Sequence, residues 1–449
     1  DELNVYSYID GNLFWLDTYK NRKILNDKFK LRNFLKNYGI KYLIITPWLD
    51  YDNYNYSKKE KWNRIKFKKK LEKIKKVIKE INPEIKLLLA LQSNIVSLDD
   101  KIQNIIRENE LNKIKKGFHH YYLDINYLVN LGIAKEEIVL DKKGRILFET
   151  YYHDWKYDNT KNFQEIALAL KAYDEGYLFN KLVDQINFTI DEIQYDGVYI
   201  DQFNQHFISP KHTRSFDKHN VNIGKINKLS GKINQLNENI SLNTYEFKKK
   251  IIDYVLTKTN FVFFNSHHIS DDFRKKKVTR FFEGFWYFWA AKMWKEDSKD
   301  LFEAKTFFSS HLSTPVALSL SFIQKGDWQL NPHNALVKNL RFCLYNGNLM
   351  YFLEQEIEKL DINETKINVF SKLYPVKIKK IYQGKIIGEK KIITIFDLKI
   401  SNEQYKNYSF FYFDEKGYII KNRQEKLTYL KDKIIVHLEK DEILIMEKK

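Results

Sequence analysis

Over about residues 1–355, short and continuously apolar segments alternate with longer amphipathic ones. Apolar strands separated by helices are typical of a parallel sheet with both faces covered. Eight such strands can be counted, which matches a (β/α)8 TIM barrel, so the sequence predicts an α/β fold. The predicted strands are residues 4–9, 42–45, 85–90, 197–200, 261–264, 278–282, 315–322 and 348–352, and the predicted helices lie near residues 27–38, 58–81, 244–258, 298–309 and 334–345.

One long interruption separates the third predicted strand from the fourth, at about residues 93–194. This is far longer than a normal connection and predicts an insertion on the side of the barrel that would carry an active site. Within it, the sequence predicts a hairpin turn at residues 141–144 and helices over residues 162–174 and 176–193. The polar segment of residues 204–239 predicts a long mobile loop over the site.

From about residue 359 the pattern changes to short apolar or alternating runs with turn signals between them. This pattern predicts an antiparallel β unit, which we expect to be a β-sandwich. The predicted domains are therefore a barrel over residues 1–358 and a sandwich over residues 359–449. The strands expected in the second domain are residues 376–378, 392–395, 410–413, 434–437 and 443–445.

The charge balance is strongly basic, with 76 Lys and Arg against 58 Asp and Glu and a formal net charge of +18. In the lysine-rich segment 58–79, Leu71, Ile74 and Ile78 recur at the spacing of one buried helix face, so the lysines are expected on the solvated face. Lysine is spread along the whole chain and no zinc-finger or RNA-recognition signature occurs, so nucleic-acid binding is not favoured. No apolar run reaches the roughly 18 residues of a membrane-spanning helix.

Three further features narrow the class of protein. The single Cys343 lies in an apolar stretch, which excludes an internal disulfide framework and predicts a buried small side chain. Aromatic residues make up 16%, and the eight tryptophans lie between Trp15 and Trp328, which fits either core packing or a platform for sugar rings. The chain begins at Asp1, so we expect a processed product, secreted or at the cell surface, with a cytoplasmic location left open.

The sharpest local motif is the segment YDGVYIDQF, residues 195–203. Asp196 and Gly197 turn the chain into a four-residue apolar strand, and Asp201 stands at its C-terminal end. In a barrel this is the face where catalytic groups gather. A carboxylate at the end of an apolar strand is costly to bury unless it is hydrogen-bonded or functional. The alternative is a structural aspartate that caps the following helix.

The D-G-x-x-x-D pattern resembles the fourth-strand nucleophile motif of retaining α-glycoside hydrolases with barrel folds, such as α-galactosidases and endo-α-N-acetylgalactosaminidases. The endo-α-1,4-polygalactosaminidase type has a similar strand. The resemblance covers about nine residues and the order of the parts. It implies a barrel followed by a β-sandwich, a two-carboxylate mechanism with Asp201 as nucleophile, and no cofactor or metal. In the α-amylase family an arginine stands two positions before the nucleophile. Here Tyr199 takes that place, which argues against α-amylase membership.

A retaining enzyme also needs a second carboxyl group about 5–5.5 Å from the first, which serves as acid and then as base. Glu283 ends the sixth predicted strand among aromatic residues, which favours a raised pKa and an available proton. Asp271 and Asp272, after the fifth strand, are the rival acids. A glutamate that pairs with Arg280 at a helix start is the structural alternative for Glu283.

Polar and aromatic residues at the other strand ends are candidates for binding sugar hydroxyls and sugar rings. Each of them could equally serve an ordinary loop. The candidates are Asp10, Trp48, Asp50, Gln92, Gln202, Asn265, His267, Trp286 and Trp289.

The absence of other motifs excludes several enzyme classes. The sequence has no Walker loop, no G-x-G-x-x-G, no H-E-x-x-H and no G-x-S-x-G. The predicted function is retaining hydrolysis of an α-glycosidic bond in an oligo- or polysaccharide, with carbohydrate as partner. The alternative is a non-catalytic carbohydrate-binding or adhesion protein on a degenerate barrel. The sequence does not predict an oligomeric state.

Overall fold

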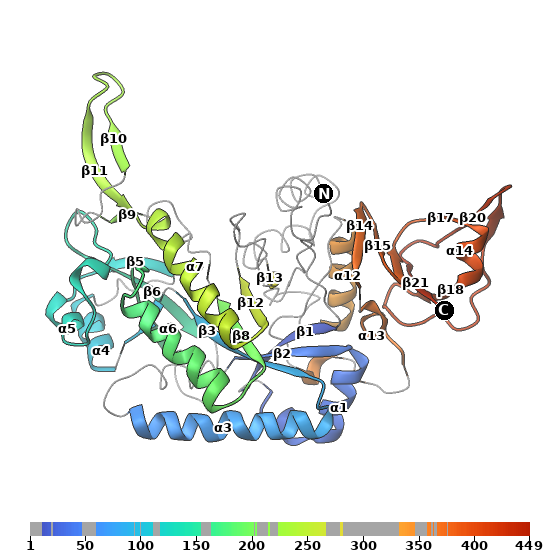
Figure 1. Cartoon of the computed structure of the whole chain (residues 1–449), viewed down its shortest axis with the longest axis horizontal. Coiled ribbons are helices and arrows are strands. Elements are labelled where there is room, and N and C mark those ends of the chain that lie inside the picture. Colours follow the sequence, from blue (N-terminus) through green and yellow to red (C-terminus); the bar gives the residue numbers. More distant parts are fainter. Residues whose placement is uncertain are drawn as a thin grey trace. The chain divides into compact units, whose positions relative to one another are not determined.

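The chain divides into two compact units in the computed structural model (Figure 1). Unit 1 comprises Asp1–Pro47, Lys73–Leu89 and Asn265–Lys449, and unit 2 comprises Trp48–Glu72 and Ala90–Phe264. The structure describes residues 11–18, 21–46, 60–93, 95–98, 100–110, 117–153, 163–201, 203, 214–215, 223–265, 279–281, 332–345, 357–360, 362, 366–374 and 376–449. The predicted strands at residues 4–9, 315–322 and 348–352 and the predicted helix at residues 298–309 lie outside these ranges.

Unit 1 begins with parallel strands in the order β1, β2, β3. Trp15 aligns with Ile44, and Ile45 aligns with Leu89 on the third strand. All four side chains are buried, so these strands are covered on both faces. Strands β2 and β3 confirm the predicted strands at residues 42–45 and 85–90, whereas β1 lies after the predicted strand at residues 4–9 and was not predicted. The elements are β1 (Asn12–Asp17), η1 (Ile24–Asn26), α1 (Lys28–Asn37), β2 (Ile40–Thr46) and β3 (Lys86–Gln92), whose last residues belong to unit 2.

The helices of this part confirm the helices that the apolar periodicity of the sequence predicts. The carboxylate of Asp27 accepts a hydrogen bond of 3.1 Å from the backbone N–H of Lys30 and so caps α1. In the lysine-rich helix α3 (Glu60–Ile81), Leu71 and Ile78 are fully buried, whereas Lys69 and Lys73 are exposed. In α12 (Pro332–Tyr345) the side chain of Cys343 is buried, and burial raises the pKa of its thiol.

Unit 2 contains the fourth and fifth predicted strands, β8 (Gly197–Asp201) and β12 (Phe261–Asn265), paired in parallel. Two helices of the same unit lie side by side and run along these strands (Figure 1). Phe179 and Phe247 make an edge-to-face contact between them, and Lys258 forms a 2.7 Å ion pair with Asp191 of the π-helical turn that follows the first helix. The helical elements are α6 (Tyr177–Asn187), a π-helical turn η3 (Phe188–Glu192) and α7 (Ile240–Lys258).

The insertion is an antiparallel sheet in the order β4, β7, β6, β5. The predicted helix at residues 162–174 is wrong, because Phe163–Ala169 forms strand β7. Ile166, Ala167, Leu168 and Ala169 are all fully buried, and a short run buried on both faces cannot be told from a helix by periodicity. The other elements are β4 (Ile95–Ser97), α4 (Asp100–Asn109), β5 (Gly117–Tyr121), α5 (Ile125–Val129), η2 (Lys135–Glu137) and β6 (Ile146–His153).

The predicted turn at residues 141–144 and the predicted helix from residue 176 are both confirmed. The carboxylate of Glu137 caps this helix, accepting hydrogen bonds from the backbone N–H groups of Tyr177 at 2.5 Å and Ala134 at 3.1 Å. Burial raises the pKa of Glu137, although these two hydrogen bonds oppose the shift. A Cβ at Gly176 would overlap this carboxylate, so a larger residue there would displace the Glu137 side chain from its capping position.

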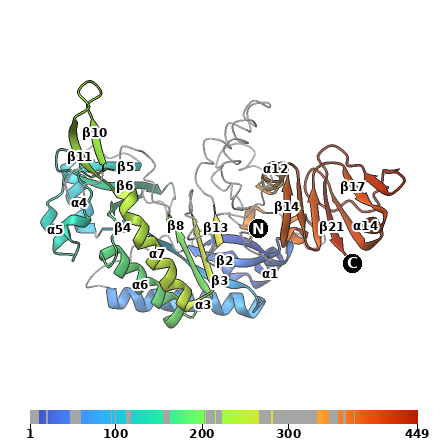
Figure 2. The same cartoon turned by 45° about the horizontal axis from the view of Figure 1, so that its top comes forward.

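Residues 204–239 were predicted to form a long mobile loop over the site, and the loop is wrong where the structure describes this segment. The segment contains an antiparallel sheet in the order β10, β11, β9. Its hairpin extends away from α6 and α7 of the same unit in both ribbon views (Figures 1 and 2). The strands are β9 (Arg214–Ser215), β10 (Ile223–Ile226) and β11 (Ile233–Asn239).

The C-terminal part of unit 1 consists of a five-stranded and a three-stranded antiparallel sheet. Both contribute to one apolar cluster, in which Ile392 and Leu444 come from the larger sheet and Leu398 and Val436 from the smaller. Two sheets around one core form a sandwich, as predicted. The larger sheet contains β14 (Ile378–Tyr382), β15 (Lys385–Gly388), β16 (Lys391–Thr394), β21 (Ile443–Lys448) and β18 (Tyr408–Phe413); the smaller contains β17 (Leu398–Ser401), β20 (Lys433–Val436) and β19 (Leu427–Tyr429). The short helical elements of this part are η5 (Ile357–Lys359), α13 (Phe370–Leu373) and α14 (Asn402–Asn407).

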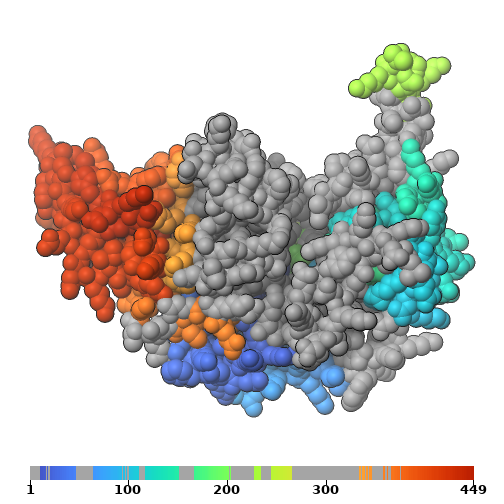
Figure 3. All heavy atoms as spheres, turned by 180° about the vertical axis from the view of Figure 1, so that it is seen from behind, coloured from blue at the N-terminus to red at the C-terminus, as the bar shows by residue number. Residues whose placement is uncertain are grey.

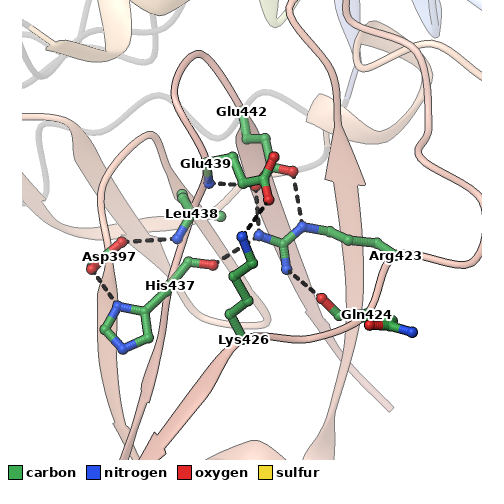
Figure 4. Close-up of polar contacts among 8 residues, drawn as sticks. All are labelled: Asp397, Arg423, Gln424, Lys426, His437, Leu438, Glu439 and Glu442. Atoms are coloured by element: carbon green, nitrogen blue, oxygen red, sulfur yellow. Dashed lines mark hydrogen bonds and ion pairs between the residues drawn. The ribbon is translucent and has the colours of Figure 1, made fainter.

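A polar network fixes one end of the sandwich (Figure 4). Arg423 forms a two-pronged ion pair with Glu442, with donor–acceptor distances of 2.8 and 2.7 Å, and both side chains are buried. The carboxylate of Asp397 accepts hydrogen bonds from the imidazole of His437 at 2.7 Å and from the backbone N–H of Leu438 at 2.8 Å.

Of the predicted barrel, the described residues form parallel strands and the helices that cover them. The sixth predicted strand corresponds to β13 (Thr279–Phe281). Within the ranges that the structure describes, the strands do not form a closed barrel. The same ranges contain no helix that is long and apolar enough to span a membrane.

Candidate functional site

The strand that carries Asp201 is buried along its whole length. It pairs in parallel with β12, so that Gly197 lies opposite Phe261 and Ile200 opposite Phe264. A Cβ at Gly197 would overlap the carbonyl oxygen of Phe261, which explains the glycine at the start of the strand. The close approach of the two backbones sets the position of the strand that ends in Asp201.

The segment before this strand is anchored at two points. The hydroxyl of Tyr195 donates a 3.1 Å hydrogen bond to the carbonyl oxygen of Leu71 on α3, and its backbone N–H donates to the carbonyl of Thr189 in the π-helical turn. Tyr195 is fully buried, and burial raises the pKa of its phenol. The entry to the strand is therefore held by the helix α3 and by the π-helical turn η3.

Asp201 lies at the C-terminal end of β8 and is 7% exposed. The side-chain amide of Gln92, itself 8% exposed, donates a hydrogen bond of 2.9 Å to the Oδ2 atom of Asp201. The hydroxyl of Ser93 donates to the backbone carbonyl of Asp201, also at 2.9 Å. Gln92 and Ser93, at the end of β3, thus hold both the side chain and the backbone of Asp201.

An aromatic contact lies directly beyond the aspartate. Phe203 is buried, and its ring centroid is 5.2 Å from that of Phe264 on β12. Asp201 is itself buried and is hydrogen-bonded to the buried amide of Gln92. Such surroundings restrict the rotamers of a carboxylate and strengthen its hydrogen bonds relative to those in water. A carboxylate held in this way can act as a nucleophile or as a proton acceptor.

Of the other predicted site residues, only Gln92 is brought to Asp201 by the described contacts. Asn265 ends β12, but its side chain is not described. The remaining predicted residues lie outside the described ranges, so their roles stay predictions. They are Asp10, Trp48, Asp50, Gln202, His267, Glu283, Trp286 and Trp289, together with the rival acids Asp271 and Asp272.

Ser93 was not among the residues predicted from the sequence. The available signal was its place directly after Gln92, at the end of an apolar strand. Nothing in the sequence, however, identifies which neighbouring strand its hydroxyl would reach. Among the described residues, no group of three or more His, Cys, Asp or Glu side chains is arranged to hold a metal ion.

Comparison with known proteins finds no matching protein-family model and no matching curated protein. Solved structures do resemble the chain along nearly its whole length. An α-amylase from H. orenii has a TM-score of 0.48 at 11% identity and covers 98% of this chain and 99% of its own. A maltogenic α-amylase from Thermotoga neapolitana has 0.45 at 11%, covering 97% and 98%. A cyclic α-maltosyl-(1→6)-maltose hydrolase from Arthrobacter globiformis has 0.46 at 9%, covering 98% and 99%.

These three neighbours are glycoside hydrolases of the α-amylase kind and not of the α-galactosidase kind. With TM-scores below 0.5, they do not place this chain in a family. Tyr199 still departs from the arginine expected in an α-amylase.

Proposed function

We propose that the protein is a glycoside hydrolase that cleaves an α-glycosidic bond in an oligo- or polysaccharide and retains the anomeric configuration. The observation that carries the proposal is the immobilised carboxylate of Asp201 at the C-terminal end of a buried parallel strand, hydrogen-bonded by Gln92. A carboxylate that must attack one carbon atom needs this fixed position. The likeness to solved structures is too distant to add to it.

In the proposed mechanism, Asp201 attacks the anomeric carbon and forms a covalent glycosyl-enzyme. Glu283 donates a proton to the leaving oxygen and then removes a proton from the water that releases the sugar. Asp271 and Asp272 remain the rival acids. All three acid candidates follow Asp201 in the sequence, so in a barrel they would stand at the ends of later strands than the nucleophile.

The proposal is tested by incubating the protein with a panel of α-linked oligosaccharides and measuring the reducing ends that are released. We expect release by the wild type and loss of nearly all activity in Asp201→Asn, with an unchanged melting temperature. Glu283→Gln should lose activity on natural linkages but keep glycosylation by substrates with an activated aryl leaving group. Glycan binding without turnover, equal in the wild type and Asp201→Asn, would support the adhesion protein instead.

A further inference from the structure

The tip of the β10–β11 hairpin is a compact turn of unit 2. Asn227 fixes it: the backbone N–H of Asn227 donates to the carbonyl of Lys232, and its side-chain oxygen accepts from the backbone N–H groups of Leu229 and Ser230 at 2.9 and 3.2 Å. Gly231 has a φ of +67° and closes the turn. A turn held by its own hydrogen bonds loses little conformational entropy when it binds something.

This turn presents an apolar side chain to solvent. Leu229 is 99% exposed and Ile233, at the first position of β11, is 59% exposed. Every residue of 227–233 is exposed, and the tip stands clear of the surrounding atoms in the space-filling view (Figure 3). A leucine that is 99% exposed contributes nothing to the core of its own chain.

The same tip is positively charged. Lys228 and Lys232 flank Leu229 and are exposed, and residues 223–237 contain Lys225 as well but no Asp or Glu. The whole chain carries a formal net charge of +18, which adds a long-range attraction to any anionic surface.

An apolar side chain between two cations fits an anionic lipid surface better than a soluble polyanion. Phosphate groups of lipid head groups attract lysines, and the acyl layer beneath them takes up an apolar side chain. A nucleic acid or an acidic polysaccharide offers the charge but no apolar layer for Leu229.

We propose that the β10–β11 hairpin docks the protein onto anionic membrane surfaces. Leu229 enters the boundary between head groups and acyl chains, and Lys228 and Lys232 contact lipid phosphates. This association is peripheral and reversible, because one apolar side chain and a few lysines give only modest affinity. It is independent of the function proposed for Asp201.

The test measures binding of the full chain to vesicles of phosphatidylcholine mixed with phosphatidylglycerol and to pure phosphatidylcholine vesicles. We expect binding to the anionic vesicles only. Leu229→Ser should weaken it about tenfold, as expected for loss of one inserted leucine, whereas Phe29→Ser, which removes an exposed aromatic side chain elsewhere, should not. The double variant Lys228→Glu with Lys232→Glu should weaken binding about tenfold more than Lys69→Glu with Lys73→Glu, which changes the net charge equally.

Insertion of position 229 into the lipid layer is measured with a fluorescent label. Cys343 is the chain's single cysteine and is buried, so a thiol-reactive, polarity-sensitive dye should label the Leu229→Cys variant at position 229. Its emission should rise and shift to the blue on anionic vesicles. Unchanged emission on anionic vesicles, or equal vesicle binding by Leu229→Ser and the wild type, would each overturn the proposal.

Discussion

The amide of Gln92 and the carboxylate of Asp201 form a buried hydrogen bond of 2.9 Å between the ends of strands β3 and β8. The two residues are 109 positions apart in the sequence. The donor is neutral and the acceptor is a carboxylate, so the bond belongs to the stronger, charge-assisted class. This relationship assigns Gln92 a specific task, which is to hold Asp201 in one orientation.

Replacing Gln92 by Leu tests this task. The variant keeps a side chain of similar size but removes the donor, so Asp201 loses one charge-assisted hydrogen bond of about 1.5–3 kcal/mol. We expect kcat to fall by about 10- to 100-fold with little change in KM. If Gln92 instead binds substrate, as the sequence first suggested, KM should rise while kcat stays near the wild-type value.

Gly197→Ala should destabilise unit 2 because the added Cβ meets the Phe261 carbonyl oxygen, a backbone atom that cannot rotate away. We expect a loss of about 1–3 kcal/mol or more in the free energy of unfolding, measured by chemical denaturation. Gly132→Ala is the comparison: its Cβ would meet nothing within 4 Å but its φ of +86° strains any side chain, so its loss reports backbone strain without a steric overlap. A free energy of unfolding for Gly197→Ala equal to that of the wild type would contradict the close approach of β8 and β12.

Two ion pairs at the same end of the sandwich should differ sharply in their contribution (Figure 4). The side chains of Arg423 and Glu442 are only 7% and 6% exposed, whereas those of Lys426 and Glu439 are 66% and 57% exposed. Arg423→Ala leaves a buried carboxylate without its main partner and should cost about 3–5 kcal/mol.

Lys426→Ala is the matched control and should cost about 1 kcal/mol or less, because both members of its pair are solvated. Scanning calorimetry of the full-length variants measures both effects. Similar melting temperatures for the two variants would show that burial of the Arg423 pair is not the deciding factor.

The third stability prediction concerns the stabilisation that Asp397 loses at low pH. Burial alone would raise the pKa of Asp397, but hydrogen bonds from the backbone N–H of Leu438 and from His437 outweigh it and lower the pKa below its ordinary value. A carboxyl group whose pKa is lower in the folded state stabilises the fold at pH values above its unfolded-state pKa of about 4. This stabilisation is lost as the pH falls through the folded-state pKa. The difference in melting temperature between the wild type and Asp397→Asn should therefore shrink as the pH drops below about 4. A difference that stays constant down to low pH would contradict the assignment.

Much of the fold could be predicted because continuous apolar runs in the sequence form buried strands in the structure. The segments around Ile44, Leu88 and Ile200 are such runs, and each is a buried strand in the structure. Strands β15, β17 and β19 were not predicted, because each has only three or four residues and β19 is largely exposed. The sequence predicts a loop at the hairpin of β10 and β11 because the segment is rich in polar residues.

The site was predictable only in part. The place of Asp201 follows from the strand that precedes it, since a strand end is visible in the sequence. Its partners Gln92 and Ser93 come from a strand 108 or 109 residues earlier, and which strands become neighbours is decided by tertiary packing. Local patterns carry no information about that choice.

The most direct test of the central claim is to identify the residue that becomes covalently glycosylated. A slowly hydrolysed, activated fluorinated α-glycosyl fluoride of the sugar released in the turnover assay should trap the intermediate. The account predicts one added glycosyl group by intact mass, located by peptide sequencing on Asp201, and no label in Asp201→Asn. Label on another carboxylate, or an inverted first-formed sugar by proton NMR, would contradict Asp201 as the nucleophile of a retaining hydrolase.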